Sequence, residues 1–135
     1  MTMAVLDVGK TSLKLVVIDA AGNILAERRR ANRPVAGGPW PALDVAGMQA
    51  WLVEGLRAQA PAHDVRHVVV ASHGSAGVLV DDTGPVLAPI DYEAEPPAAV
   101  VAEHRRLAPP FPERGAALMG GATHFARQLL WMRAV

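Results

Sequence analysis

The sequence contains no cysteine, and this absence excludes several kinds of chemistry. The chain of 135 residues can form no disulfide, no thiolate zinc site and no covalent intermediate on a cysteine. A surplus of one charge is also missing, because 13 basic side chains balance 13 acidic ones. Proteins that bind the phosphate backbone of nucleic acids normally carry a basic surplus, so we expect no nucleic-acid partner.

Long apolar runs are absent as well. The longest span four or five residues, such as 15–18, whereas a helix needs ~20 to cross a bilayer. Asp7 interrupts the N-terminal segment before the apolar region of a signal peptide could form. With 51% hydrophobic and 19% charged residues, the chain still has enough apolar side chains to fold. We therefore expect a folded cytoplasmic domain without membrane contact, and this length suits a single domain.

The first part of the chain predicts three consecutive strands. Residues 3–8 and 13–19 are apolar runs, and residues 24–30 can continue as a third strand. The turn-forming groups 9–12 (Gly-Lys-Thr-Ser) and 21–23 (Ala-Gly-Asn) separate them. Strands joined by such tight turns form an antiparallel meander. We expect Arg28-Arg29-Arg30 to be the solvated end of an edge strand, with a nucleic-acid patch as the weaker alternative.

A helix and a further strand follow the loop at 34–41, which is rich in proline and glycine. Asp44 can cap a helix that runs to about residue 60, where Pro61 would end it. Residues 66–72 (RHVVVAS) form a continuous apolar run, which is typical of a strand buried on both faces. A strand, a crossover helix and a buried strand together predict a parallel addition to the meander.

The remainder predicts less regular structure. Short apolar runs around 81–84 (Asp-Asp-Thr-Gly) indicate a hairpin. Residues 91–115 read as an irregular, proline-rich insertion, within which a short helix fits at 98–107. Residues 125–135 look helical. The histidines show no spacing typical of metal ligands, so we expect no transition-metal site.

Lysine is scarce, and its position draws attention to the first turn. Of the 13 basic residues 11 are arginine, and Lys10 and Lys14 stand close together. Residues 4–11 match a loose P-loop pattern with alanine in place of the first glycine, but a P-loop opens a helix and residues 13–18 look like a strand. We favour a phosphate-binding hairpin, in which Gly9 lets the backbone approach an anion.

The other residues of this hairpin suit the same chemistry. Thr11 and Ser12 offer hydroxyl and N–H donors at the turn, and Lys14 can return alongside the phosphates on the second strand. Asp7, at the end of the first strand, can position Mg²⁺ through water, because magnesium keeps much of its hydration shell.

Residues 7–14 (Asp-Val-Gly-Lys-Thr-Ser-Leu-Lys) resemble the first phosphate motif of the FGGY family of carbohydrate kinases, in the actin and hexokinase superfamily. Lys10 departs from the family pattern, because many members have a small hydroxyl residue there. Residues 68–74 resemble the family strand that ends in a histidine-glycine pair near the sugar. Residues 89–93 resemble the segment with a sugar-binding aspartate, and 120–131 the segment that leads into a helix with a Leu-Trp pair.

The resemblance implies a ribonuclease H-like (actin-like ATPase) α/β fold with a mixed sheet, of which residues 1–135 would form the N-terminal portion of an incomplete first lobe. The parent enzyme would transfer the γ-phosphate of ATP to a sugar hydroxyl with Mg²⁺. The residues implied for phosphate and magnesium are Asp7, Gly9, Lys10, Thr11, Ser12 and Lys14, with Asp7 as the magnesium residue. The residues implied for the sugar are His73, Gly74 and Asp91.

The resemblance also implies what these residues do not supply. In the family the catalytic base is an aspartate in a later motif, so we expect it beyond residue 135 and expect the isolated chain to be inactive. The alternative is a non-enzymatic module of the same fold that binds a small ligand or forms a homodimer, because apolar surface left uncovered promotes association.

Overall fold

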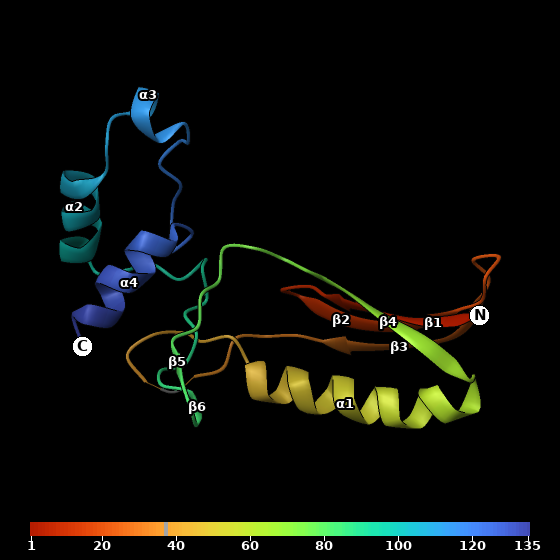
Figure 1. The fold of residues 1–135 in the computed structure, drawn as a ribbon. Helices are drawn as coiled ribbons and strands as arrows, with labels where there is room; N and C mark the ends of the chain where they lie inside the picture. Colours follow the sequence, from red (N-terminus) through yellow and green to blue (C-terminus); the bar gives the residue numbers. More distant parts are fainter. Residues whose placement is uncertain (37) are drawn as a thin grey trace. The chain divides into compact units, whose positions relative to one another are not determined.

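The computed structural model describes residues 1–36 and 38–135, which form helices and a mixed sheet (Figure 1). These residues divide into two compact units. The first consists of residues 1–33 and 44–74, and the second of residues 34–43 and 75–135.

The first unit is built on a four-stranded sheet in the order β3-β2-β1-β4. Its elements are β1 (Thr2–Val8), β2 (Ser12–Ile18), β3 (Ile24–Ala31), α1 (Val45–Ala62) and β4 (Val65–Ser72). The pairs β1–β2 and β2–β3 are antiparallel, while β4 lies parallel to β1. The prediction of a meander, a crossover helix and a parallel strand is therefore confirmed.

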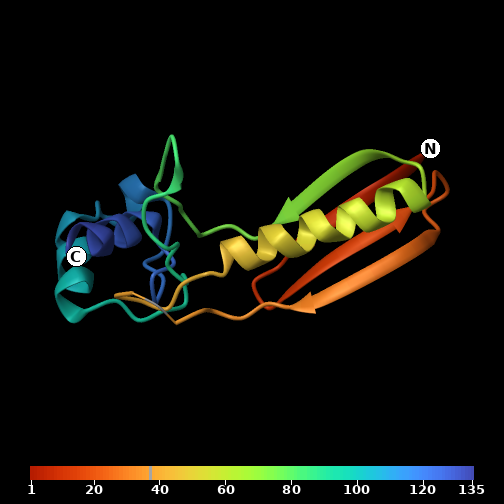
Figure 2. The same ribbon diagram turned by 90° about the horizontal axis from the view of Figure 1, so that it is seen from below.

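Helix α1 covers one face of this sheet (Figure 2). Alternate residues of a strand point to the same face, so Leu6, Leu15 and Val17 lie buried together beneath the helix. The partly buried residues that pack against them are Ala26, Trp51, Leu52, Leu56 and Val65. Burial of each large apolar side chain contributes about 1.5–3 kcal/mol, so this cluster holds α1 on the sheet.

The arginines of β3 are less solvated than expected. Arg28 forms an ion pair with Glu54 of α1 at 3.1 Å and lies over the ring of Trp51. Arg30 contacts the N-terminal end of α1 through the Asp44 carboxylate, at 2.6 Å. Side chains at alternate positions share a face, so two of the three arginines reach the helix, and the expectation of a solvated end holds for Arg29 alone.

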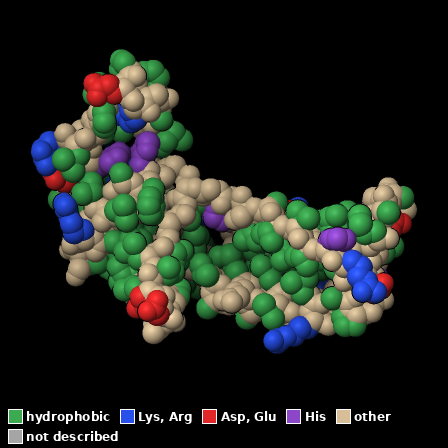
Figure 3. Space-filling view, in the orientation of Figure 1, with side chains coloured by type: hydrophobic (Ala, Val, Ile, Leu, Met, Phe, Trp, Pro, Cys, Tyr) green, Lys and Arg blue, Asp and Glu red, His purple; other side chains and the backbone are tan. Residues whose placement is uncertain are grey.

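Two further expectations for the first unit are wrong. Pro61 does not end α1 but lies inside its last turn, and the helix ends at Ala62. Proline is tolerated there because its missing N–H removes only one backbone hydrogen bond close to the helix end. Strand β4 is not buried on both faces, since Val68, Val69 and Val70 are 51%, 47% and 60% exposed. β4 is an edge strand, and the described residues leave much of it uncovered; apolar side chains gather over this sheet in Figure 3.

The second unit contains a small hairpin and three helices. Its elements are β5 (Val80–Asp81), β6 (Gly84–Pro85), α2 (Ala98–Leu107), α3 (Phe111–Arg114) and α4 (Phe125–Arg133). The Asp81 carboxylate accepts hydrogen bonds from the Thr83 and Gly84 N–H groups, which closes the predicted hairpin. Each of the two strands has only two residues, and α3 adds a turn of helix within 91–115.

The core of the second unit lies around two tryptophans. Trp40 and Trp131 meet edge to face, with ring centroids 5.6 Å apart. The other buried members of the cluster are Ala42, Ile90, Ala94, Val100, Ala122 and Met132. Among the described residues of both units, no helix is long and apolar enough to cross a membrane.

Candidate phosphate-binding turn

The turn between β1 and β2 leaves no room for a side chain at position 9. The Gly9 N–H donates to the Ser12 carbonyl oxygen at 3.0 Å and closes the turn. A Cβ atom at Gly9 would lie 2.7 Å from that same oxygen, closer than real Cβ contacts allow. Glycine therefore lets the two strands meet in a tight hairpin with its backbone near the surface.

Asn32, which the sequence analysis did not identify, stabilises this turn through two hydrogen bonds. Its backbone N–H donates to the Thr11 carbonyl at 2.9 Å, and its Nδ2 donates to the Gly9 carbonyl at 3.2 Å. The side chain is buried, and its Oδ1 has no hydrogen-bond partner among the described residues. The only signal in the sequence was a polar amide directly after the third strand.

Asp7 and Lys14 stand opposite each other on β1 and β2, at the base of the turn. The Lys14 Nζ lies 3.3 Å from the Asp7 Oδ2, and the two side chains are 34% and 47% exposed. A pair this exposed contributes only about 0–1 kcal/mol, so Lys14 can exchange its partner at little cost. Lys10 and Thr11 form the tip of the turn, where Thr11 is exposed.

His73 and Gly74 follow β4 at the same end of the sheet. Because β4 is parallel to β1, Ser72 lies opposite Val8, and the His73 N–H donates to the Val8 carbonyl at 3.2 Å. The His73 Nδ1 lies 3.1 Å from the Gly74 carbonyl. The carboxyl ends of parallel strands are where α/β proteins usually bind ligands. The structure thus brings the residues of the turn and the histidine-glycine pair to the same end of the sheet.

Asp91 belongs to the second unit, where it forms part of a turn. It is 5% exposed, and its Oδ1 accepts a hydrogen bond from the Glu93 N–H at 3.0 Å. Its carbonyl accepts from Ala94 and its N–H donates to Pro41, at 2.8 and 2.9 Å. These bonds give Asp91 a structural role, as expected of an aspartate that closes a turn.

The donors at the first turn fit magnesium only together with phosphates. No group of three or more carboxylate or imidazole side chains could hold a metal in the part of the chain that the structure describes. Mg²⁺ in phosphoryl-transfer sites usually keeps several waters and uses one or two carboxylates besides the substrate phosphates. The half-exposed Asp7 carboxylate meets that requirement for one protein donor.

The geometry after the turn removes the P-loop alternative. A P-loop requires a helix N-terminus behind the phosphate-binding residues, whereas β2 begins directly at Ser12. A glycine turn between two antiparallel strands, followed by a third strand, a crossover helix and a parallel strand, defines the class instead. It is a partial lobe of the actin-like sugar-kinase fold.

Comparisons with known proteins agree with this class. No protein-family model and no curated protein matches the sequence. Among solved structures, a carbohydrate kinase from Novosphingobium aromaticivorans is 28% identical with a TM-score of 0.89, over 97% of this chain and 28% of that one. A xylulose kinase from Lactobacillus acidophilus is 15% identical with a TM-score of 0.72, over 98% and 28%. A glycerol kinase from Plasmodium falciparum is 16% identical with a TM-score of 0.69, over 98% and 29%.

These matches confirm the predicted resemblance to carbohydrate kinases. Nearly all of this chain has the fold of one portion of such a kinase, and the chain spans only 28 to 29% of the length of these three neighbours.

Proposed function

We propose that this chain is the phosphate-binding portion of an FGGY-type sugar kinase, which transfers the γ-phosphate of ATP to a sugar hydroxyl. The observation that carries the proposal is the tight turn at Gly9, with Asp7 and Lys14 paired at its base. The likeness to the carbohydrate kinase from Novosphingobium aromaticivorans supports it, and the glycerol kinase from Plasmodium falciparum was solved with ADP.

In this proposal the turn holds phosphates by its backbone and one lysine. The N–H groups of Lys10, Thr11 and Ser12 would donate to phosphate oxygens, as in other backbone anion sites. Lys14 would leave Asp7 for the phosphates, and Asp7 would then hold Mg²⁺ through water. When bound, the metal neutralises charge that develops on the phosphoryl group. Asn32 keeps the Gly9 and Thr11 carbonyls turned away from the anion, which fixes the turn.

The sugar would lie beside the phosphate turn. His73 stands one hydrogen bond away from the end of β1, and a neutral imidazole both donates to and accepts from hydroxyl groups. Gly74 has open space where a side chain would be, which leaves room for a ligand. Asp91 keeps its proposed role as a second sugar ligand only through the family resemblance, because its Oδ1 already closes a turn.

We further propose that the isolated chain does not phosphorylate sugars. Phosphoryl transfer requires a base to accept the hydroxyl proton, and the family resemblance assigns that base to a later motif. ATP-dependent sugar phosphorylation by the purified chain would contradict this part of the proposal. A cytoplasmic location and the absence of a nucleic-acid partner remain predictions from the sequence.

The test of phosphate binding is a titration of the chain with MgADP. Lys14→Gln should weaken binding about tenfold, because a charge-assisted contact contributes about 1.5–3 kcal/mol. The matched control is Arg66→Gln at the start of β4, which removes an exposed ion pair with Asp64 and should leave the affinity unchanged. Equal affinities for the wild type and Lys14→Gln would contradict the proposed role of the lysine.

A second candidate function has one observation in its favour. The exposed valines of β4 favour self-association, as in a non-enzymatic module that forms a homodimer. Such a module would associate without any dependence on nucleotide, whereas the kinase proposal requires MgADP to bind at the turn.

A further inference from the structure

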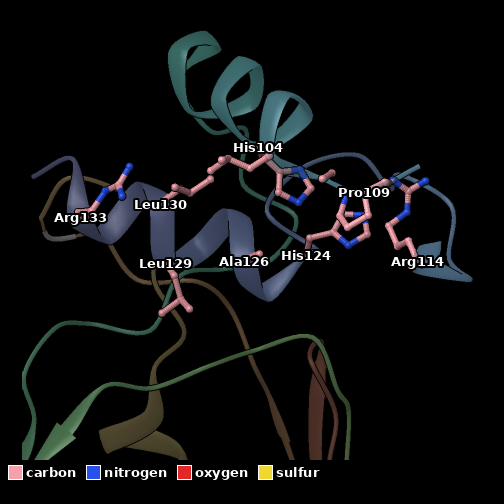
Figure 4. Close-up of a pocket in the computed structure, with 10 residues that line it drawn as sticks. His104, Pro109, Arg114, His124, Ala126, Leu129, Leu130 and Arg133 are labelled. Carbon is pink, nitrogen blue, oxygen red and sulfur yellow. The ribbon is translucent and has the colours of Figure 1, made fainter. Parts of the chain in front are cut away.

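A pocket of about 520 Å³ is lined only by residues of the second unit (Figure 4). It is formed by the C-terminal end of α2, the segment 108–114 and one side of α4. Its volume falls within the range of about 300–1,000 Å³ that is common for small-molecule sites.

One end of the pocket carries polar groups. In Figure 4 the rings of His104 and His124 and the guanidinium of Arg114 gather at this end, beside Pro109. The two imidazole centroids are 5.1 Å apart. Arg114 donates to the Pro109 carbonyl at 3.0 Å and to the Ala116 carbonyl, which fixes its side chain. The guanidinium is therefore held in place before any ligand arrives.

The two histidines are neutral hydrogen-bonding groups. His124 accepts the Met119 N–H at its Nε2, at 2.8 Å, and the His104 Nδ1 faces the Arg127 guanidinium at 3.3 Å. With its Nδ1 accepting that bond, His104 carries its proton on Nε2. Burial, and then the nearby Arg127, lower the pKa of both histidines. The guanidinium groups of Arg114 and Arg127 are the charged groups beside these two histidines.

The middle of the pocket is apolar, lined by Leu129 and Leu130 of α4. Beyond these leucines, Arg133 lies at the end opposite Arg114. None of the described residues that line the pocket is a carboxylate. A site with an arginine at each end, no acidic group and an apolar middle selects an anion that carries an apolar group.

We propose that this pocket binds a small carboxylate with an apolar body, with its carboxylate at the end formed by His104 and Arg114. The planar guanidinium suits a carboxylate geometrically, and the leucines of α4 receive the apolar body. A fully hydrated inorganic anion would gain nothing from those leucines, and a neutral compound of the same shape would gain nothing from Arg114. The site does not depend on the proposed kinase function, because it involves no residue of the first unit.

The test uses the ¹⁵N-labelled chain with benzoate, benzamide and inorganic phosphate as probes. Benzoate should shift the amide signals of residues 104–114 and 124–133, while benzamide and phosphate should bind at least about tenfold more weakly. Arg114→Gln should weaken benzoate binding about tenfold, because it removes a charge-assisted donor. Arg105→Gln is the matched control, since Arg105 is exposed on α2 and does not line the pocket.

Arg114 also supports its own loop, so Arg114→Lys is added to separate binding from folding. The lysine variant keeps the charge, and it should bind benzoate more tightly than Arg114→Gln does. The proposal is overturned if benzoate shifts no signals at the pocket, if benzamide or phosphate binds as tightly as benzoate, or if Arg114→Gln binds benzoate like the wild type.

Discussion

Replacing Gly9 by alanine tests the turn on which the proposed phosphate site depends. The new Cβ would lie 2.7 Å from the Ser12 carbonyl oxygen, which accepts the hydrogen bond that closes the turn. That oxygen belongs to the backbone at the start of β2, so it cannot rotate away as a side chain could. The turn must open, and loss of its closing bond should cost about 0.5–1.5 kcal/mol of stability.

An opened turn also misdirects the N–H groups that follow Gly9. We expect MgADP affinity to fall by at least about tenfold, the equivalent of one lost charge-assisted contact. Urea unfolding measures the stability and isothermal titration the affinity. Gly120→Ala is the matched control, because a Cβ there meets nothing within 4 Å and should change neither quantity. If Gly9→Ala behaves like Gly120→Ala in both assays, the steric argument is refuted.

The remaining predictions concern α1 and β4. Asp44→Ala removes the cap that accepts the Gly47 N–H at 2.9 Å and should cost about 1 kcal/mol at neutral pH by urea unfolding. The hydrogen bond from Arg30, and then that from Gly47, lowers the pKa of Asp44. The wild type should therefore be more stable than Asp44→Ala by the full amount above the ordinary pKa of 3.8, and by less as the pH falls below it. A stability difference that stays constant down to acid pH would contradict this. Gly47→Ala should destabilise α1 despite the better helix propensity of alanine, because its Cβ would displace the Asp44 carboxylate from the Gly47 N–H and from Arg30; a raised urea midpoint would contradict the geometry. Val70→Lys on β4 should reduce self-association measured by sedimentation, whereas Val53→Lys on α1 should not. A wild type that stays monomeric at high concentration would contradict this prediction.

Local patterns were sufficient to predict most of the first unit. Alternation of apolar residues and the glycine turn identified β1 and β2, and the apolar spacing with Asp44 identified α1. The continuous apolar run of 66–72 correctly indicated a parallel strand. Such a run shows that both faces of the strand are suited to burial, but it does not show whether other residues cover them. Exposure of β4 therefore could not be read from its sequence.

Contacts between distant residues were beyond the sequence. Asn32 reaches Gly9 across 23 positions, and its role depends on the exact register of β3 beside the turn. The salt bridge of Arg30 with Asp44 requires α1 to lie on the sheet before either residue can be interpreted. The burial of Asp91 likewise follows from packing in the second unit, so the sequence pattern around Asp91 could not predict it.

A crystal structure of the chain with MgADP would test the central claim most directly. The account predicts a phosphate within hydrogen-bond distance of the N–H groups of residues 10–12, with Lys14 turned from Asp7 towards it. A nucleotide bound elsewhere, or bound at the turn while the 3.3 Å pair of Lys14 and Asp7 stays intact, would contradict the account.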